Sequence, residues 1–80
     1  MIYDFFVFGN GVNKATKIDS TGTVDDAADA AKEYIENETG TICNTVIHVP
    51  GNRTLNELAK LEEREILLLG KAIQIFYYEV

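Results

Sequence analysis

The stretch VDDAADAAKEYIENE, residues 24–38, is the strongest structural signal in this chain. At about 100° per residue, an α-helix gathers five of its carboxylates inside an arc of about 100°. They are Asp25, Asp26, Asp29, Glu33 and Glu36. The opposite arc is apolar and holds Val24, Ala27, Ala28, Ala30, Ala31, Tyr34 and Ile35. The pattern predicts a helix with one dry face and one acidic face.

Both ends of this helix carry recognisable signals. Thr23 precedes the first turn and Asp26 stands at the third helical position, which is close to a capping box with Asp in place of Glu. Gly40 is a typical stop residue, because glycine adopts the left-handed backbone conformation that ends many helices. We therefore expect the helix to lie between Thr23 and Gly40.

The acidic face carries most of the net charge of the chain, which is -6. Residues 24–38 contain six acids and one lysine, so they contribute -5 of it. Neighbours such as Asp25 and Asp29 repel each other by a few tenths of a kcal/mol at this spacing. Two interpretations stay open: a solvated face, which most amphipathic helices have, and a surface selected to bind a basic partner.

Before the helix, Ile2–Phe8 is rich in aromatic and β-branched residues, which predicts a strand. It is apolar on both faces, which indicates either a central strand covered on both sides or a face that meets another chain. The turn residues Gly9-Asn10-Gly11 end it, and Lys14–Asp19 is expected to return as a polar, exposed strand. We expect the loop of this hairpin to be longer than two residues.

After the helix, Thr41–Val49 reads as a third strand that ends at the turn Pro50-Gly51. Thr54–Glu57 matches a capping box and predicts a second helix that ends near Arg64. Its expected apolar face consists of Leu55, Leu58, Ala59 and Leu61.

The C-terminal part is expected to be a hairpin of Ile66–Leu69 and Ala72–Tyr78 around a Gly70-Lys71 turn. The alternative extends the second helix through Leu69. The order β-β-α-β-α-β-β predicts one small α+β domain over residues 1–80, with two helices on a mainly antiparallel sheet of four to five strands.

Composition excludes several classes of protein. With 13 Asp and Glu against 7 Lys and Arg, direct nucleic-acid binding is disfavoured, and a basic partner protein is favoured. A single cysteine excludes an internal disulfide and indicates a reducing, cytoplasmic location. No apolar stretch reaches the ~20 residues that a membrane span needs.

The residues offer little for catalysis. Cys43 and His48 are the only thiol and imidazole, and on one strand they would point to opposite faces, roughly 17 Å apart. Such a pair makes neither a nucleophile dyad nor a zinc site. Gly9-Asn10-Gly11 lacks the rest of a dinucleotide-binding fingerprint. We expect no enzyme activity, no catalytic residues, no metal and no cofactor.

The favoured hypothesis is a non-enzymatic inhibitor or regulator whose acidic helix occupies a basic, nucleic-acid-binding surface of a partner protein. The aromatic C-terminal strand would serve as an anchor or as a homodimer surface. The predicted partner-binding residues are Asp25, Asp26, Asp29, Glu33, Glu36, Phe76 and Tyr78. Compact, acidic, motif-free α+β proteins of this size resemble, in type, phage-encoded inhibitors of host defence such as anti-CRISPR proteins.

Two alternatives remain. The segment Ser20–Ala27, which leads into the acidic Ala-rich helix after a short hairpin, resembles the partial ribonuclease-H-like part of HicB-type antitoxins. This resemblance covers barely a third of the chain and implies a toxin-neutralising module, although the DNA-binding segment of such antitoxins is missing here. The other alternative is a structural homo-oligomer without a ligand, which buries the strand at Phe76–Tyr78.

Overall fold

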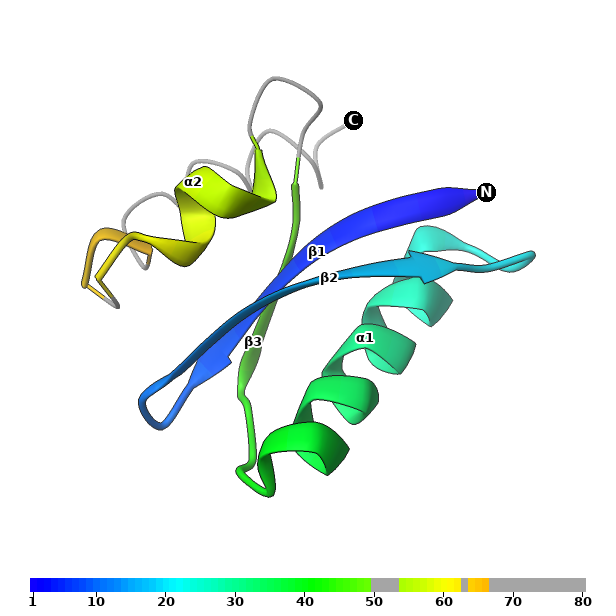
Figure 1. Cartoon of the computed structure of the whole chain (residues 1–80). Helices are drawn as coiled ribbons and strands as arrows, with labels where there is room; N and C mark the ends of the chain where they lie inside the picture. Colours follow the sequence, from blue (N-terminus) through cyan, green and yellow to red (C-terminus); the bar gives the residue numbers. More distant parts are fainter. Residues whose placement is uncertain (50–53, 63, 67–80) are drawn as a thin grey trace.

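The computed structural model describes residues 1–49, 54–62 and 64–66 (Figure 1). Within these ranges the elements are β1 (Ile2–Gly9), β2 (Val12–Asp19), α1 (Val24–Thr39), β3 (Thr45–His48) and α2 (Leu55–Ala59). The strands form an antiparallel sheet in the order β2-β1-β3. The predicted α+β class is confirmed. Of the predicted C-terminal hairpin, residues 67–78 lie outside the described residues.

β1 is the central strand of this sheet, as its apolar sequence predicted. It pairs with β2 along its whole length and with β3 from Phe5 to Phe8. These four residues, Phe5, Phe6, Val7 and Phe8, are at most 1% exposed. Because neighbouring side chains alternate between the faces of a strand, both faces of β1 must be covered by other elements.

The two helices provide this cover from opposite sides (Figure 1). On the α1 side the buried cluster consists of Phe5, Val7, Ala27, Ala31, Ile35 and Cys43. On the α2 side it consists of Phe6, Phe8, Ile47, Val49, Leu58 and Ile66. The sheet therefore separates two small cores, and β1 contributes alternate aromatic side chains to each of them.

The hairpin between β1 and β2 has a loop of only two residues, so the predicted longer loop is wrong. Asn10 and Gly11 both have positive φ, 53° and 82°, which is the type I′ turn that Asn-Gly favours. β2 consequently begins at Val12, two residues earlier than predicted. The polar Asn13 fits in this strand because its side-chain amide donates to the carbonyl of Leu61, 3.2 Å away.

The capping box of α1 is confirmed. The Asp26 backbone N–H donates to Thr23 Oγ1 at 3.2 Å, and the Thr23 backbone N–H donates to the Asp26 carboxylate at 3.1 Å. At the other end Gly40 has φ 71° and its N–H donates to the carbonyl of Glu36. Both ends of α1 are thus fixed where the sequence placed them.

The dry face of α1 is narrower than predicted. Ala27, Ala31 and Ile35 are buried, whereas Ala30 is exposed and Tyr34 is 53% exposed. A single helix lying on a sheet touches it along a narrow stripe, and residues at the margin of the apolar arc remain in solvent.

β3 covers only Thr45–His48, so the predicted strand from Thr41 to Val49 is too long. Residues 41–44 carry the chain from the end of α1 to the sheet without strand pairing. Beyond β3, the Val49 N–H still donates to the carbonyl of Asp4 at 2.9 Å. Cys43 therefore lies in a connection rather than on the strand that carries His48.

α2 is also shorter than predicted, because the helix stops at Ala59 and a turn follows at Lys60. Thr54 caps its start by accepting from the Glu57 N–H. Leu58 is buried, but Ala59 is exposed, contrary to the predicted apolar face.

A separate helical stretch follows α2. Residues 64–66 are helical, and the Ile66 N–H donates to the carbonyl of Glu62 at 3.0 Å. The Glu65 carboxylate accepts from the Glu62 N–H, the kind of contact that starts a new helix. The predicted strand is therefore wrong at Ile66, and the alternative of one continuous second helix is wrong as well, because α2 ends at Ala59 before this stretch begins.

Candidate functional site

The solvent side of α1 carries three exposed carboxylates at successive helical turns, Asp25, Asp29 and Glu33, which we call the acidic face. They lie opposite the buried residues Ala27 and Ala31, which hold the helix against the sheet. Residues four apart on a helix are neighbours on its surface, so the three side chains form one row. The structure therefore presents them together on a capped, core-anchored element.

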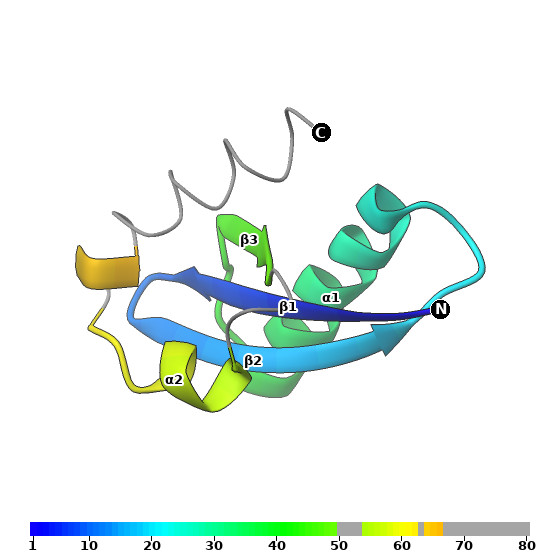
Figure 2. The same ribbon diagram turned by 90° about the horizontal axis from the view of Figure 1, so that it is seen from above.

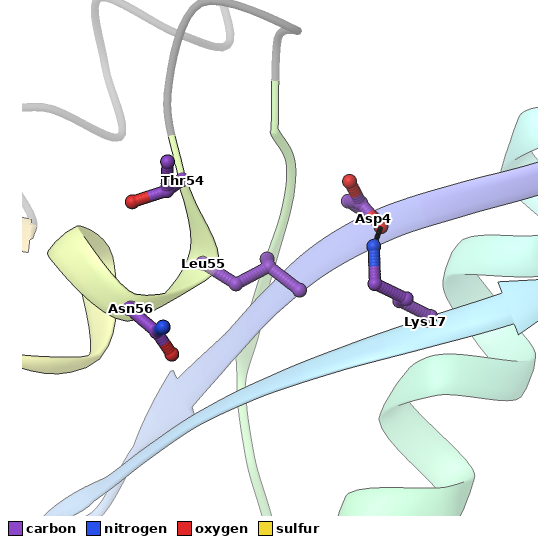
Figure 3. A pocket seen from close by; sticks show the side chains of 5 residues that line it. All are labelled: Asp4, Lys17, Thr54, Leu55 and Asn56. Carbon is purple, nitrogen blue, oxygen red and sulfur yellow. Dashed lines mark hydrogen bonds and ion pairs between the residues drawn. The ribbon is translucent and has the colours of Figure 1, made fainter.

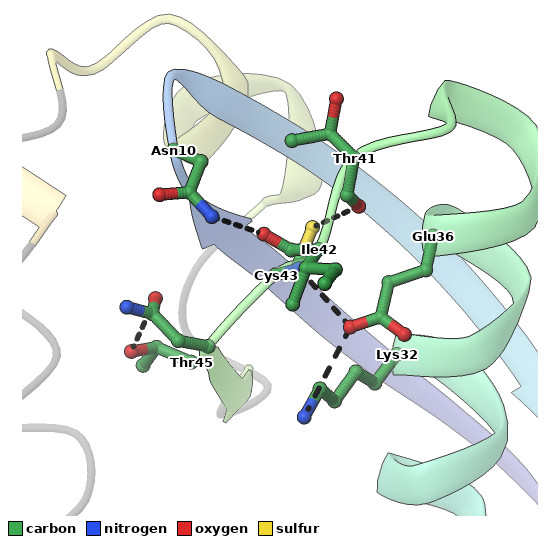
Figure 4. A network of polar contacts seen from close by, with 8 residues as sticks. Asn10, Lys32, Glu36, Thr41, Ile42, Cys43 and Thr45 are labelled. Carbon is green, nitrogen blue, oxygen red and sulfur yellow. Dashed lines mark hydrogen bonds and ion pairs between the residues drawn. The ribbon is translucent and has the colours of Figure 1, made fainter.

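Two of the five predicted carboxylates have contacts within the fold. Asp26 closes the capping box through its bond with Thr23. Glu36 turns toward the connection after α1, where its Oε1 accepts from the backbone N–H of Cys43 at 3.0 Å (Figure 4). Lys32 Nζ lies 3.9 Å from the same oxygen. Sequence patterning groups all five residues, but only three present carboxylates that are exposed and outside these contacts.

The electrostatic surroundings leave the acidic face uncompensated by nearby bases. Among the described residues, the ion pairs join Lys17 to Asp4, Lys32 to Glu36 and the N-terminal amine to Asp19. None of these pairs involves Asp25, Asp29 or Glu33. A cation supplied by another molecule would therefore not have to displace an ion pair of the described residues, and Lys32 is the nearest base along the helix.

Cys43 is fully buried, and its Sγ donates to the carbonyl of Thr41 at 3.7 Å (Figure 4). Burial raises the pKa of its thiol, the negative charge of Glu36 raises it further, and Lys32 acts in the opposite direction. The thiol is therefore protonated near neutral pH and is a weak nucleophile.

His48 lies on the α1 side of the sheet, opposite Phe5 in the register of β1 and β3. Its ring lies 5.8 Å from the Tyr3 ring and 5.6 Å from the Phe5 ring, measured between centroids. Burial lowers the pKa of this imidazole, and Asp4 opposes that shift. Since Cys43 packs in the same α1-side core, the prediction that Cys43 and His48 lie on opposite faces is wrong.

An open hollow of about 380 Å³ lies between α2 and the sheet (Figure 3). It is lined by Asp4, Lys17, Thr54, Leu55 and Asn56. Lys17 Nζ and Asp4 Oδ1 pair at 2.9 Å across neighbouring strands, so the two charged groups of the hollow already satisfy each other. This lining offers no thiol or imidazole for chemistry.

Metal-ligand clusters and membrane-spanning helices are both absent from the described ranges. Within them no group of three or more His, Cys, Asp and Glu side chains is arranged to hold a metal ion. In the same ranges no helix has both the length and the apolar character to cross a bilayer.

One exposed apolar residue was missed by the sequence patterns. Ile42 is 72% exposed, because the side chain of Asn10 donates to its backbone carbonyl and fixes the connection beside the hairpin turn (Figure 4). The sequence placed Ile42 inside a strand, and no local signal indicates this long-range contact. The predicted anchors Phe76 and Tyr78 lie outside the described residues.

Comparisons with protein-family models, with curated proteins and with solved structures found no match to this chain.

Proposed function

We propose that this protein is a non-enzymatic inhibitor or regulator that binds a basic, nucleic-acid-binding surface of a partner protein through the acidic face of α1. In type it would act like small phage-encoded inhibitors of host defence such as anti-CRISPR proteins. One observation carries the proposal: three exposed carboxylates, Asp25, Asp29 and Glu33, lie in one row and pair with no cation in the described part of the chain.

The geometry suits a rigid electrostatic contact. At 1.5 Å per residue, the three carboxylates follow one another at about 6 Å along the helix axis. The caps at Thr23 and Gly40 and the buried side of α1 hold this row before any partner arrives. A preorganised row loses little conformational entropy on binding, and opposite charge on the partner would accelerate encounter.

Catalysis has no place in this proposal. The buried thiol of Cys43 stays protonated, and the imidazole of His48 packs against two aromatic rings. A protonated, buried thiol is a weak nucleophile, so the proposal assigns Cys43 a packing role. The lone, buried cysteine also supports a cytoplasmic location, where thiols remain reduced.

The finer prediction of a sheet with four to five strands is part of the same proposal. Phe76 and Tyr78 would then lie on a C-terminal strand and add an aromatic anchor to the electrostatic contact. The test of the acidic face does not depend on this strand, because none of the substituted residues lies in it.

The test compares two variants with the same total charge. One neutralises the acidic face as Asp25→Asn, Asp29→Asn and Glu33→Gln. The control neutralises three exposed glutamates elsewhere, as Glu38→Gln, Glu57→Gln and Glu62→Gln. Each immobilised protein is incubated with lysate of the native host at about 50 mM and about 500 mM salt, and duplex DNA is then added as a competitor.

We expect the wild type and the control to retain a nucleic-acid-binding protein at low salt. Both should release it at high salt or when duplex DNA is added as a competitor. The acidic-face variant should retain at least about tenfold less, while its circular dichroism stays unchanged. Equal retention by both variants would show that the acidic face is only solvated. Retention that DNA does not displace would exclude a nucleic-acid-binding surface as the target.

A further inference from the structure

The outer edge of β2 carries a row of backbone groups that pair with no strand in the described part of the chain. The two-residue turn at Asn10-Gly11 makes Gly9 and Val12 a hydrogen-bonded pair, and such pairs alternate along an antiparallel hairpin. The residues of β2 between these pairs therefore direct their N–H and C=O groups away from β1. They are Asn13, Ala15, Lys17 and Asp19.

No described strand pairs with this edge, since the sheet order is β2-β1-β3 and β1 lies between the other two (Figure 2). β2, which provides this edge, is eight residues long, whereas β3 at the other side of the sheet is four residues long. An exposed edge of this kind is a template for another strand unless side chains prevent pairing. In β2 the side chains that could prevent pairing are Lys14 and Lys17.

The sequence of β2 is complementary to itself in one antiparallel register. Opposite residues must share a face of the sheet, so a two-fold axis through a residue of β2 is required. With the axis at Ala15, each apolar end meets an apolar end and each lysine meets a neutral polar residue. The pairs are Ala15 with Ala15, Val12 with Ile18, Asn13 with Lys17, and Lys14 with Thr16.

Neighbouring registers of the same strand pair are less stable because of where they place the lysines. An axis at Lys14 or at Lys17 places two lysines opposite each other, and like charges in that position are destabilising. An axis at Thr16 sets Lys14 against the apolar Ile18. The lysines thus select one register instead of preventing pairing altogether.

The register centred on Ala15 also lets the outward backbone groups pair and keeps each side chain on the matching face of the sheet. Ala15 directs its N–H and C=O outward and has a small side chain, so two copies can approach closely at the axis. Val12 and Ile18 already pack at the margin of the α1-side core, while Ala15 packs at the margin of the α2-side core. A second copy would continue both cores across the axis.

We propose that this protein forms a two-fold dimer in which β2 of one copy pairs antiparallel with β2 of the other, centred on Ala15. The dimer surface is separate from the acidic face. Each copy carries a net charge of -6, so the two repel at low salt. The dimer should therefore tighten as salt rises, whereas binding through the acidic face should weaken.

The first measurement is the mass of the wild-type protein in solution by sedimentation equilibrium, from about 1 to about 100 µM, at two salt concentrations. The matched variant is Ala15→Pro, which removes an outward N–H and no bond to β1. We expect a dimer in the wild type and a dissociation constant at least about tenfold higher in the variant. A monomer at the highest concentration overturns the proposal.

A cross-linking pair makes the test independent of how proline is tolerated. Ala15→Cys places two thiols across the axis, where opposite Cα atoms of a hydrogen-bonded pair lie about 5.5 Å apart, within disulfide range. Ala30→Cys, on the exposed side of α1, is the control. Under mild oxidation the first variant should form a linked dimer and the second should not. Equal cross-linking of the two cysteine variants would assign the dimer contact to another surface. The same conclusion would follow if Ala15→Pro left the dimer intact and Ala15→Cys gave no cross-linked dimer.

Discussion

Replacing Glu36 by alanine should destabilise the protein far more than replacing its neighbour Glu33, although the sequence assigns both to one acidic surface. Glu36 Oε1 accepts the Cys43 N–H at 3.0 Å, and its side chain is 28% exposed. Glu33 is exposed and lies outside the ion pairs of the described residues. The two substitutions have the same chemistry and occupy the same helix, so Glu33→Ala is the control.

The magnitude follows from the contacts. A hydrogen bond to a charged acceptor contributes about 1.5–3 kcal/mol when buried, and partial exposure lowers this. The Lys32 pair at 3.9 Å adds only about 0.3–0.5 kcal/mol, because it is an exposed pair four residues apart. Glu36→Ala also leaves the backbone N–H of the fully buried Cys43 without this acceptor. We therefore expect a loss of about 1–2 kcal/mol, against at most about 0.5 kcal/mol for Glu33→Ala.

The assay is urea unfolding followed by circular dichroism, supported by thermal unfolding. A domain of this size loses about 4–8 °C in Tm for each kcal/mol. Glu36→Gln keeps an oxygen acceptor and should fall between the wild type and Glu36→Ala. Burial is the main cause of the raised pKa of Cys43, and the negative charge of Glu36 is the second cause. Glu36→Gln removes that charge, so a titration of the thiolate absorbance should give a lower pKa for Cys43.

The reasoning would be refuted if Glu36→Ala and Glu33→Ala unfolded at the same urea concentration with equal slopes. That result would show that the Cys43 N–H is equally well satisfied without Glu36. An unchanged Cys43 pKa in Glu36→Gln would separately refute the electrostatic coupling between the two side chains.

Two further predictions follow from single residues. The ring of His48, the only histidine, should titrate below its usual pKa of 6.5 in an NMR experiment, because burial disfavours its charged form more than Asp4 favours it. Between the folded and unfolded pKa values of His48, the unfolded chain binds more protons than the folded one. The free energy of unfolding should therefore fall as the pH drops below 6.5 and level off below the folded pKa. A measured pKa at or above 6.5 contradicts this prediction. Gly9→Ala should destabilise the protein by about 2 kcal/mol or more in urea unfolding, since φ is +144° and a Cβ would meet the Asn44 side chain and lie 2.8 Å from its backbone nitrogen. Gly11→Ala, at φ +82° with open space around it, should lose only about 1 kcal/mol, and equal losses would show that the contact with Asn44 is unimportant.

The candidate site was predictable where it depends on one helix. The positions of Thr23, Asp26 and Gly40 announce both ends of α1, because capping is decided by residues close in sequence. The spacing of Asp25, Asp29 and Glu33 likewise places them on one side of any helix. Glu36 has the same spacing, but its acceptor role depends on Cys43, seven residues later, which helical periodicity does not report.

Errors in the predicted fold have a common origin. The return strand was predicted from Lys14 but begins at Val12, and the place of Asn13 in it depends on an acceptor at Leu61. Thr41–Asn44 looked β-rich, yet the connection there is fixed by Glu36 and Asn10. The apolar run that begins at Ile66 predicted a strand, whereas Ile66 packs in the α2-side core as part of a helical stretch.

The sequence by itself determined the amphipathic helix, the apolar central strand and the acidic charge, because each of these depends on residues a few positions apart. Tertiary structure alone decided that Glu36 is drawn to a buried N–H and is lost from the exposed acidic row. It also decided that Cys43 and His48 share one side of the sheet. The physical reason is that a buried polar group must find a partner wherever the fold brings one, and that partner is distant in sequence.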